Sequence, residues 1–147
     1  TPMCTSTKFD KDEEGMKIDE KKYRGMIGSL FYLTVSRPDI MFVVCLCGRF
    51  QSCPKASHLI AVKIIFTYLK RILNYDLWYP KCHEFALYNF LDADFGGCML
   101  DRKSTSGTCH FLGNYLVSWF SEKQNAISLS TVETEYIAAG VCCAQLL

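Results

Sequence analysis

Four carboxylates in the second half of the chain are the residues whose types and spacing suit catalytic chemistry. Asp92 and Asp94 close a run of alternating apolar residues, and Glu133 and Glu135 open a segment with helical spacing. Carboxylates carried by a strand end and a helix start often form a site for a divalent cation, because hard cations such as Mg²⁺ take oxygen ligands from rigid elements. The pattern therefore predicts a metal site built by these two elements, with Asp92, Asp94 and Glu135 as candidate ligands.

The same carboxylates also suit structural roles. Ser130 and Glu133 fit a capping box, in which Glu133 reaches back to the backbone N–H of the capping residue. Glu135 lies about 200° further round the helix, among apolar neighbours that turn it partly inward, where an acid must be paired, protonated or bound to a metal. Strand alternation places Asp92 and Asp94 on one face with Tyr88 and Phe90. A pair of glycines follows, so Asp94 is either a ligand or a turn former.

Several motifs carry a family resemblance. The second half of the chain reads DADFGG at 92–97, DRKSTSG at 101–107, FLGNYLVSWFSEKQ at 111–124 and SLSTVETEYIAA at 128–139. In this order the motifs resemble the ribonuclease H domain in the Pol polyproteins of plant copia-type LTR retrotransposons. The upstream stretches YRGMIGSLFYLTVSRPDIMF and AVKIIFTYLKRILNYDLWYP resemble the thumb-like end of the reverse transcriptase in the same polyproteins.

The resemblance implies hydrolysis of the RNA strand in an RNA–DNA hybrid. Two Mg²⁺ or Mn²⁺ ions, about 4 Å apart, would activate a water and stabilise the leaving 3′-oxygen. Asp92 matches the ligand on the first strand and Glu135 the ligand on the helix, so both are the expected catalytic residues, with Asp94 as a further metal ligand. Recognition would go through the backbone and the 2′-hydroxyls of the hybrid.

The family also uses a further aspartate on a strand after this helix, and nothing follows Leu147 in the sequence. The catalytic aspartate pair of the reverse transcriptase is absent too. Because two carboxylates hold Mg²⁺ poorly, we expect this chain alone to be inactive, as a fragment of a Pol polyprotein whose intact form is a ribonuclease H. The alternative is a non-catalytic remnant of a decayed retroelement that keeps weak nucleic-acid binding.

Charge is unevenly distributed along the chain. Residues 21–85 carry ten basic and three acidic side chains, whereas residues 86–147 carry three basic and six acidic ones. A basic stretch before an acidic one fits a polyanion-binding surface beside a carboxylate site, although a solvated helix surface gives the same pattern. The candidate nucleic-acid-binding residues lie on the helix expected at 55–73 and in the polar loop after the first strand. They are Lys63, Lys70, Arg71, Arg102, Lys103 and Ser104.

The expected fold class is α+β. Residues 1–20 form an arm or linker, residues 21–80 a helical segment resembling the reverse-transcriptase thumb, and residues 84–147 a partial ribonuclease H-like domain with three antiparallel strands and one helix. Helices are expected from Asp19, from Pro38 to about Phe50, from Lys55 to Leu73 and from Thr131. Strands are expected at Glu84–Asp92, Thr108–Leu112 and Tyr115–Ser121. A hairpin turn is expected at Gly113-Asn114. The inward stripe expected for the third helix is Leu59, Val62, Ile65, Phe66, Leu69, Ile72 and Leu73.

Other site classes receive little support. The nine cysteines include no CxxC pair, and a zinc site built from Cys82, His83, Cys109 and His110 lacks the usual ligand spacing. No uncharged apolar run reaches ~18 residues, and the first residues contain no apolar signal region. We therefore expect no membrane span, reduced thiols and an intracellular location, in a cytoplasmic particle or the nucleus. The expected partners are an RNA–DNA hybrid and the rest of the Pol polyprotein.

Overall fold

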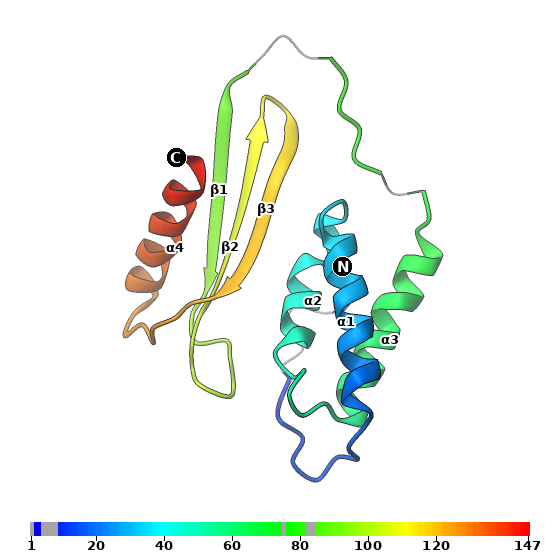
Figure 1. Ribbon diagram of the computed structural model, residues 1–147. Coiled ribbons are helices and arrows are strands. Elements are labelled where there is room, and N and C mark those ends of the chain that lie inside the picture. Colours follow the sequence, from blue (N-terminus) through cyan, green and yellow to red (C-terminus); the bar gives the residue numbers. More distant parts are fainter. Residues whose placement is uncertain (1, 4–8, 75, 82–84) are drawn as a thin grey trace. The chain divides into compact units, whose positions relative to one another are not determined.

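The computed structural model describes residues 2–3, 9–74, 76–81 and 85–147 (Figure 1). The chain divides into two compact units, Thr1–Asp76 and Leu77–Leu147. Helices form the first unit, and a three-stranded antiparallel sheet with one helix forms the second. This arrangement confirms the α+β fold class, with N-terminal helices followed by a small sheet. Among the described residues, no helix combines the length and apolarity needed to cross a membrane.

The helices of the first unit are α1 (Glu20–Thr34), the short 3₁₀ helix η1 (Pro38–Ile40), α2 (Met41–Gly48) and α3 (Ala56–Arg71). Asp19 caps α1, because its carboxylate accepts from the backbone N–H of Lys22 at 3.1 Å. Pro38 opens η1, where a fixed φ and a missing N–H cost nothing. The helical segments thus begin within one residue of their predicted starts, but the second one, expected as a single helix from Pro38 to about Phe50, is divided into η1 and α2. Both α2 and α3 end two residues earlier than expected.

The core of the first unit is apolar, and it is formed by one face of each helix. The expected stripe on α3 is wrong in part: Phe66 and Leu73 are 37% and 77% exposed, whereas His58 and Ala61 are buried. The chain before α1 also packs on the start of α3, where His58 contacts the carbonyl of Asp10. The buried apolar cluster consists of Tyr23, Ile27, Leu30, Ile40, Val43, Val44, Cys47, Ala61, Val62 and Ile65.

The described part of the N-terminal arm, residues 9–18, packs on the start of α3. Lys55 is buried, and its ammonium donates to the carbonyls of Glu13 and Gly15, both at 2.9 Å. His58 accepts from the backbone N–H of Lys55 and its other ring nitrogen contacts the carbonyl of Asp10 at 2.9 Å. The ring of Phe50 stacks on that of His58, with centroids 4.0 Å apart. The packing of this arm on α3 could not be predicted from the sequence, because the arm is rich in charged residues and has no hydrophobic periodicity.

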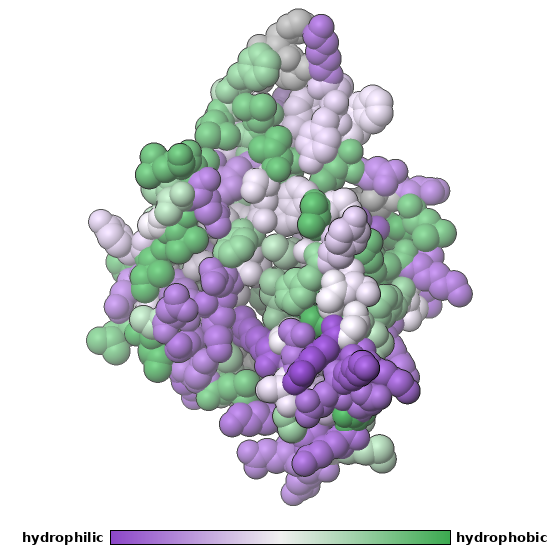
Figure 2. Space-filling view, viewed as in Figure 1, coloured by the Kyte–Doolittle hydropathy of each residue, from purple (hydrophilic) through white to green (hydrophobic). Residues whose placement is uncertain are grey.

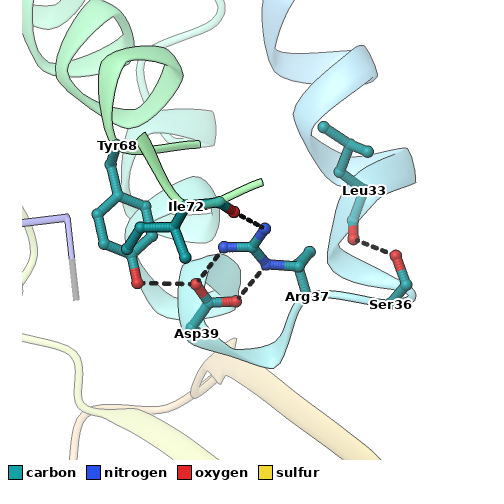
Figure 3. Close-up of polar contacts among 6 residues, drawn as sticks. All are labelled: Leu33, Ser36, Arg37, Asp39, Tyr68 and Ile72. Carbon is teal, nitrogen blue, oxygen red and sulfur yellow. Dashed lines mark hydrogen bonds and ion pairs between the residues drawn. The ribbon is translucent and has the colours of Figure 1, made fainter. Parts of the chain in front are cut away.

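A partly buried ion pair joins the start of η1 to the end of α3 (Figure 3). Arg37 binds both carboxylate oxygens of Asp39, at 2.9 and 2.8 Å, and also donates to the carbonyl of Ile72. Tyr68 donates its hydroxyl to the same carboxylate at 2.9 Å. The hydrogen bond from Arg37 is the main reason why the pKa of Asp39 lies below its usual range. Because a bidentate guanidinium pair is directional, this cluster fixes how α3 ends against η1.

The sheet of the second unit has the strand order β1 (Leu87–Asp94), β2 (Thr105–Leu112) and β3 (Tyr115–Lys123). Gly113 adopts a φ of 58° in the two-residue turn between β2 and β3, as the Gly-Asn pair predicts. Strand β2 begins three residues before its predicted start. The expected polar loop at 101–107 is therefore wrong in its second half, since its hydroxyl residues enter the strand and satisfy their polar groups there.

Helix α4 (Thr131–Leu146) packs on one face of this sheet, against β1 and to a smaller extent β2 (Figure 1). Thr108 and His110 of β2 both contact the amide oxygen of Gln145 in α4, at 2.8 and 3.1 Å. Asn89 of β1 lies opposite His110 and bonds its ring at 2.8 Å. Because paired residues share a face, the residues of β1 that face α4 are Leu87, Asn89, Leu91 and Ala93.

Candidate carboxylate site of the second unit

The two aspartates of β1 lie on the sheet face away from α4. Asp92 pairs with Gly107 and Asp94 with Thr105, and alternation places them on one face with Tyr88 and Phe90, as the sequence predicts. Both carboxylates are exposed. One oxygen of Asp92 accepts from the backbone N–H that follows it, at 2.9 Å. The end of β1 thus presents two acids toward solvent.

Asp94 takes part in the turn that leaves β1. Its carboxylate lies against Gly97, where a side chain would collide with it. Gly96 has a φ of 61°, a conformation that L-residues rarely adopt, and its N–H donates to the hydroxyl of Ser104 at 3.0 Å. Of the two roles open to Asp94 in the sequence, the turn role is the one for which the structure gives contacts.

The two glutamates at the start of α4 differ in their surroundings. Ser130 caps the helix by accepting from the N–H of Glu133 at 3.1 Å, as predicted. The carboxylate of Glu133 accepts from the N–H of Leu129 at 2.7 Å, one residue before the cap and not from the cap itself. The expected capping box is wrong in that detail. Glu135 is half-buried.

Asp92 and Asp94 lie on the face of β1 away from α4, the helix that carries Glu135, so the outer edge of β1 separates the strand acids from the helix acid. That edge is free within the described sheet, since β1 pairs only with β2 there. Because α4 covers the face opposite Asp92, a cation shared with Glu135 would sit at this edge and not over the sheet. In the part of the chain that the structure describes, no three His, Cys, Asp or Glu residues cluster closely enough to hold a metal.

A buried polar cluster of Ser104, Ser106, Gln124 and Thr134 connects β2, the end of β3 and α4. None of these contacts is predicted from the sequence. Gln124, the last residue of the SEKQ motif, is 6% exposed and contacts β2 and α4. Ser104, Ser106 and Thr134 are also buried. Two signals in the sequence point to this cluster: these polar residues lie in the motifs that carry the family resemblance, and Gln124 directly follows an alternating strand. Polar residues in such positions need partners if they are buried.

The candidate cations of the first unit are accessible. Lys63, Lys70 and Arg71 of α3 are all exposed. A basic helix face of this kind attracts phosphates through charge alone.

The loop before β2 is more constrained than its composition indicates. Arg102 is exposed and has a φ of 57°, whereas Lys103 donates to the carbonyl of Asn125 at 2.6 Å. Ser104 is 1% exposed, so a phosphate could reach its hydroxyl only by displacing its neighbours. Asp101 pairs with Lys123 at 2.6 Å, and the hydrogen bond from Lys123 is the main cause of a lowered pKa of Asp101.

Two of the four residues considered for a zinc site, Cys82 and His83, lie outside the described residues. His110 is buried and occupied by the amide oxygens of Asn89 and Gln145. Burial raises the pKa of the Cys109 thiol, which disfavours the thiolate that a zinc ion needs. Both ring nitrogens of His110 thus have partners within the protein, which indicates a structural role for this residue.

Comparison with known proteins identifies relatives over most of the chain. The Arabidopsis thaliana protein named "Retrovirus-related Pol polyprotein from transposon RE1" is 37% identical over 136 residues, which are 92% of this chain and 9% of the relative. The Nicotiana tabacum Pol polyprotein from transposon TNT 1-94 is 34% identical over 146 residues, 95% of this chain and 11% of the relative. A Plasmopara viticola protein named "Secreted RxLR effector protein 161" is 36% identical over 117 residues, 79% of this chain and 82% of the relative.

The chain thus spans about a tenth of the length of the Pol polyproteins that it matches. No family model matches the chain, and no solved structure matches it. Identity above 30% over more than nine-tenths of the chain nevertheless establishes common descent with the transposon proteins. The chain belongs to the family of retrovirus-related Pol polyproteins from copia-type transposons.

Proposed function

We propose that the second unit supplies the first two metal-binding carboxylates of a ribonuclease H-type site, Asp92 from β1 and Glu135 from α4. The activity of that site in the intact Pol polyprotein is hydrolysis of the RNA strand in an RNA–DNA hybrid during reverse transcription, in a cytoplasmic particle or the nucleus. One observation carries the proposal: in a member of the Pol family, a free-edged strand that carries an exposed aspartate near its end packs against a helix whose second acid is half-buried.

The chemistry follows from the ligand types. When bound at the edge of β1, Mg²⁺ or Mn²⁺ supplies Lewis-acid activation of a water and of the scissile phosphate. Asp92 and Glu135 would provide two oxygen ligands, and Asp94, two residues further along the same face of β1, is the candidate for an auxiliary one. Since two carboxylates leave most coordination positions to water and to substrate phosphates, we expect binding to be weak until the hybrid is present.

The exposed cations suit the polyanionic substrate. Lys63, Lys70 and Arg71 lie on α3 and Arg102 in the loop before β2. Each phosphate that they neutralise adds about 0.9 to the slope of log affinity against log salt concentration. Hybrid binding should therefore weaken steeply as salt rises.

The test is Mn²⁺ binding to the 147-residue chain, followed by electron paramagnetic resonance of the free ion in the presence of a hybrid oligonucleotide. We expect Asp92→Asn and Glu135→Gln each to weaken binding about tenfold. Glu122→Gln, an exposed carboxylate of β3 in the same unit, is the matched control and should leave binding unchanged. Equal Mn²⁺ affinity in Asp92→Asn and Glu122→Gln would refute the proposal.

Without a further aspartate ligand, this chain should not cleave the hybrid at a measurable rate. Incubation with Mn²⁺ and an end-labelled hybrid checks this expectation. Cleavage that is lost in Asp92→Asn would show that the two carboxylates suffice.

The second candidate function is metal-independent nucleic-acid binding by a remnant of the polyprotein. It is favoured by the position of Asp92 and Asp94 on the face away from α4. In that case the hybrid would bind with the same affinity with and without Mn²⁺, and Lys70→Ala would weaken it while Asp92→Asn would not.

A further inference from the structure

We infer that Gln124 is a positioning residue that fixes the first turn of α4, and with it Glu135, against the end of β1. The inference rests on the proposed function for its consequence in metal binding. Gln124 follows β3, is 6% exposed, and lies between β2 and α4.

Every polar atom of the Gln124 side chain is used. Its Nε2 donates to the hydroxyl of Ser106 at 2.9 Å and to the backbone carbonyl of Thr134 at 3.0 Å. Its Oε1 accepts from the hydroxyl of Ser128 at 3.3 Å. Its backbone N–H donates to the carbonyl of Ser104 at 2.9 Å. One amide thus connects the start of β2, the loop before α4 and the first turn of α4.

A second set of contacts continues this connection to β1. The hydroxyls of Ser104 and Thr134 are 3.3 Å apart, and Ser104 also accepts from the N–H of Gly96 in the turn after β1. Thr134 is fully buried and donates its hydroxyl to the carbonyl of Ser130. The turn that follows the acidic end of β1 is therefore linked by hydrogen bonds, through Ser104, to the part of α4 that carries Glu135.

The position of Thr134 explains why the amide acts on Glu135. The carbonyl that Gln124 holds belongs to the peptide group joining Thr134 to Glu135. Fixing this peptide fixes the direction in which the neighbouring carboxylate leaves the helix. Because apolar contacts are few among the buried residues of this unit, directional bonds must set the helix position here.

The decisive variant is Gln124→Glu, which keeps the size of the side chain but replaces the donor toward the Thr134 carbonyl by an oxygen. Asn125→Asp makes the same change of charge one residue later, at an exposed side chain, and is the matched control. Ser106→Ala removes a single partner of the amide and serves if Gln124→Glu does not fold.

The first readout needs no metal. Hydrogen exchange of the α4 amides, resolved by NMR in the full chain, should become about tenfold faster at residues 134–136 in Gln124→Glu, the effect expected from losing one or two buried hydrogen bonds. Exchange at residues 143–146 should change less, and Ser106→Ala should give a smaller acceleration in the first turn. First-turn exchange unchanged in both variants, or accelerated equally along all of α4, would overturn the inference.

The second readout is Mn²⁺ broadening of the amide signals of Asp92 and Glu135. In the parent chain we expect one ion to broaden both signals at the same Mn²⁺ concentration. In a folded Gln124→Glu chain, about tenfold more Mn²⁺ should be needed for Glu135 than in Asn125→Asp. If the parent chain shows no broadening at either residue, the proposed function fails while the exchange result still decides the role of Gln124. If Gln124→Glu and Asn125→Asp broaden alike, the positioning role fails.

Discussion

The two units of this chain bury different chemistry. Among the residues that the structure describes, fourteen hydrophobic ones are buried, and only Cys98, Ala138 and Cys142 of these belong to the second unit. The buried polar residues described in that unit are mostly serines and threonines, together with Gln124. Apolar burial is non-directional and stabilises in proportion to the area removed from water. A buried hydrogen bond contributes only about 1 kcal/mol net, but it is costly to leave unmade. The first unit therefore has the more robust core, and the second has the more closely specified geometry.

The exposed surface shows the other side of this contrast. Tyr88 and Phe90 on the open sheet face are 50% and 59% exposed, and hydrophobic side chains remain visible over the face shown in Figure 2. Phe90 meets Phe111 edge-on with centroids 5.6 Å apart, so these aromatic residues contact one another. The second unit thus leaves several large apolar side chains exposed, whereas most of the buried side chains described in it are polar.

The largest expected effect is in the apolar core of the first unit. Ile65→Ala removes a fully buried side chain of α3 and should lower the free energy of unfolding by about 3 kcal/mol. Ile64→Ala, at a neighbouring position that is 43% exposed, should cost less than about 1 kcal/mol. Denaturant unfolding followed by far-UV circular dichroism checks both. Equal costs at the two positions would show that the first unit is not organised around this core.

The next effect concerns the polar cluster of the first unit. Asp39→Ala leaves the largely buried guanidinium of Arg37 without its carboxylate partner and should destabilise by about 2–3 kcal/mol. The side chains of this pair are only 12% and 14% exposed. Glu20→Ala breaks the exposed pair with Arg24, where both side chains are more than half exposed, and should cost at most about 0.5 kcal/mol. The same unfolding measurement compares them, and a loss in Asp39→Ala no greater than in Glu20→Ala would contradict the argument.

In the second unit, Thr134→Val keeps the shape of the side chain and removes its hydroxyl. We expect a loss of about 1–2 kcal/mol, because the buried hydroxyl of Ser104 loses its partner in α4 and the carbonyl of Ser130 loses one of its two donors. Trp78 and Trp119, the two tryptophans of the chain, both belong to this unit, so tryptophan fluorescence follows its unfolding. Thr131→Val, at an exposed position, is the control. If Thr134→Val lowers the free energy of unfolding no more than Thr131→Val does, buried hydroxyl groups do not stabilise the second unit in the way proposed here.

The smallest expected effect is a pH dependence in the first unit. The pKa of Asp39 is lowered on folding, chiefly by the hydrogen bond from Arg37, so the native state favours the ionised form. The stabilisation it provides is complete above the unfolded pKa of about 3.9 and is lost as pH falls through the lower folded value. Unfolding measured from pH 5 to pH 2 should show this loss, and Asp39→Asn should reduce its slope. A slope identical in the two proteins would exclude Asp39 as its source.

The sequence predicts the parts of this molecule that follow a simple period. Helix α1 appears where Tyr23, Ile27 and Leu30 recur at helical spacing. Gly113 marks the hairpin, because a two-residue turn of this kind needs a residue with a positive φ. The shared face of Asp92 and Asp94 follows from strand alternation.

What the sequence does not predict depends on contacts between distant residues. Lys55 and Gln124 are polar, and nothing in their local sequence shows that folding will bury them against carbonyls and hydroxyls 10 to 42 residues away. The face of the sheet on which α4 packs is likewise a tertiary choice. The sequence therefore indicates candidate site residues by their type and by the family resemblance, but not how their side chains lie relative to one another.

The burial of the cysteines gives each unit its own chemical reporter. Burial raises the pKa of Cys47 in α2 to about 12, so its thiol is protonated at neutral pH and reaches an alkylating reagent only when the first unit opens. Cys142 is the corresponding buried thiol in α4, whereas Cys53 and Cys143 are exposed. The alkylation rates of Cys47 and Cys142, read by mass spectrometry in one sample, would thus time the opening of both units separately without any engineered label.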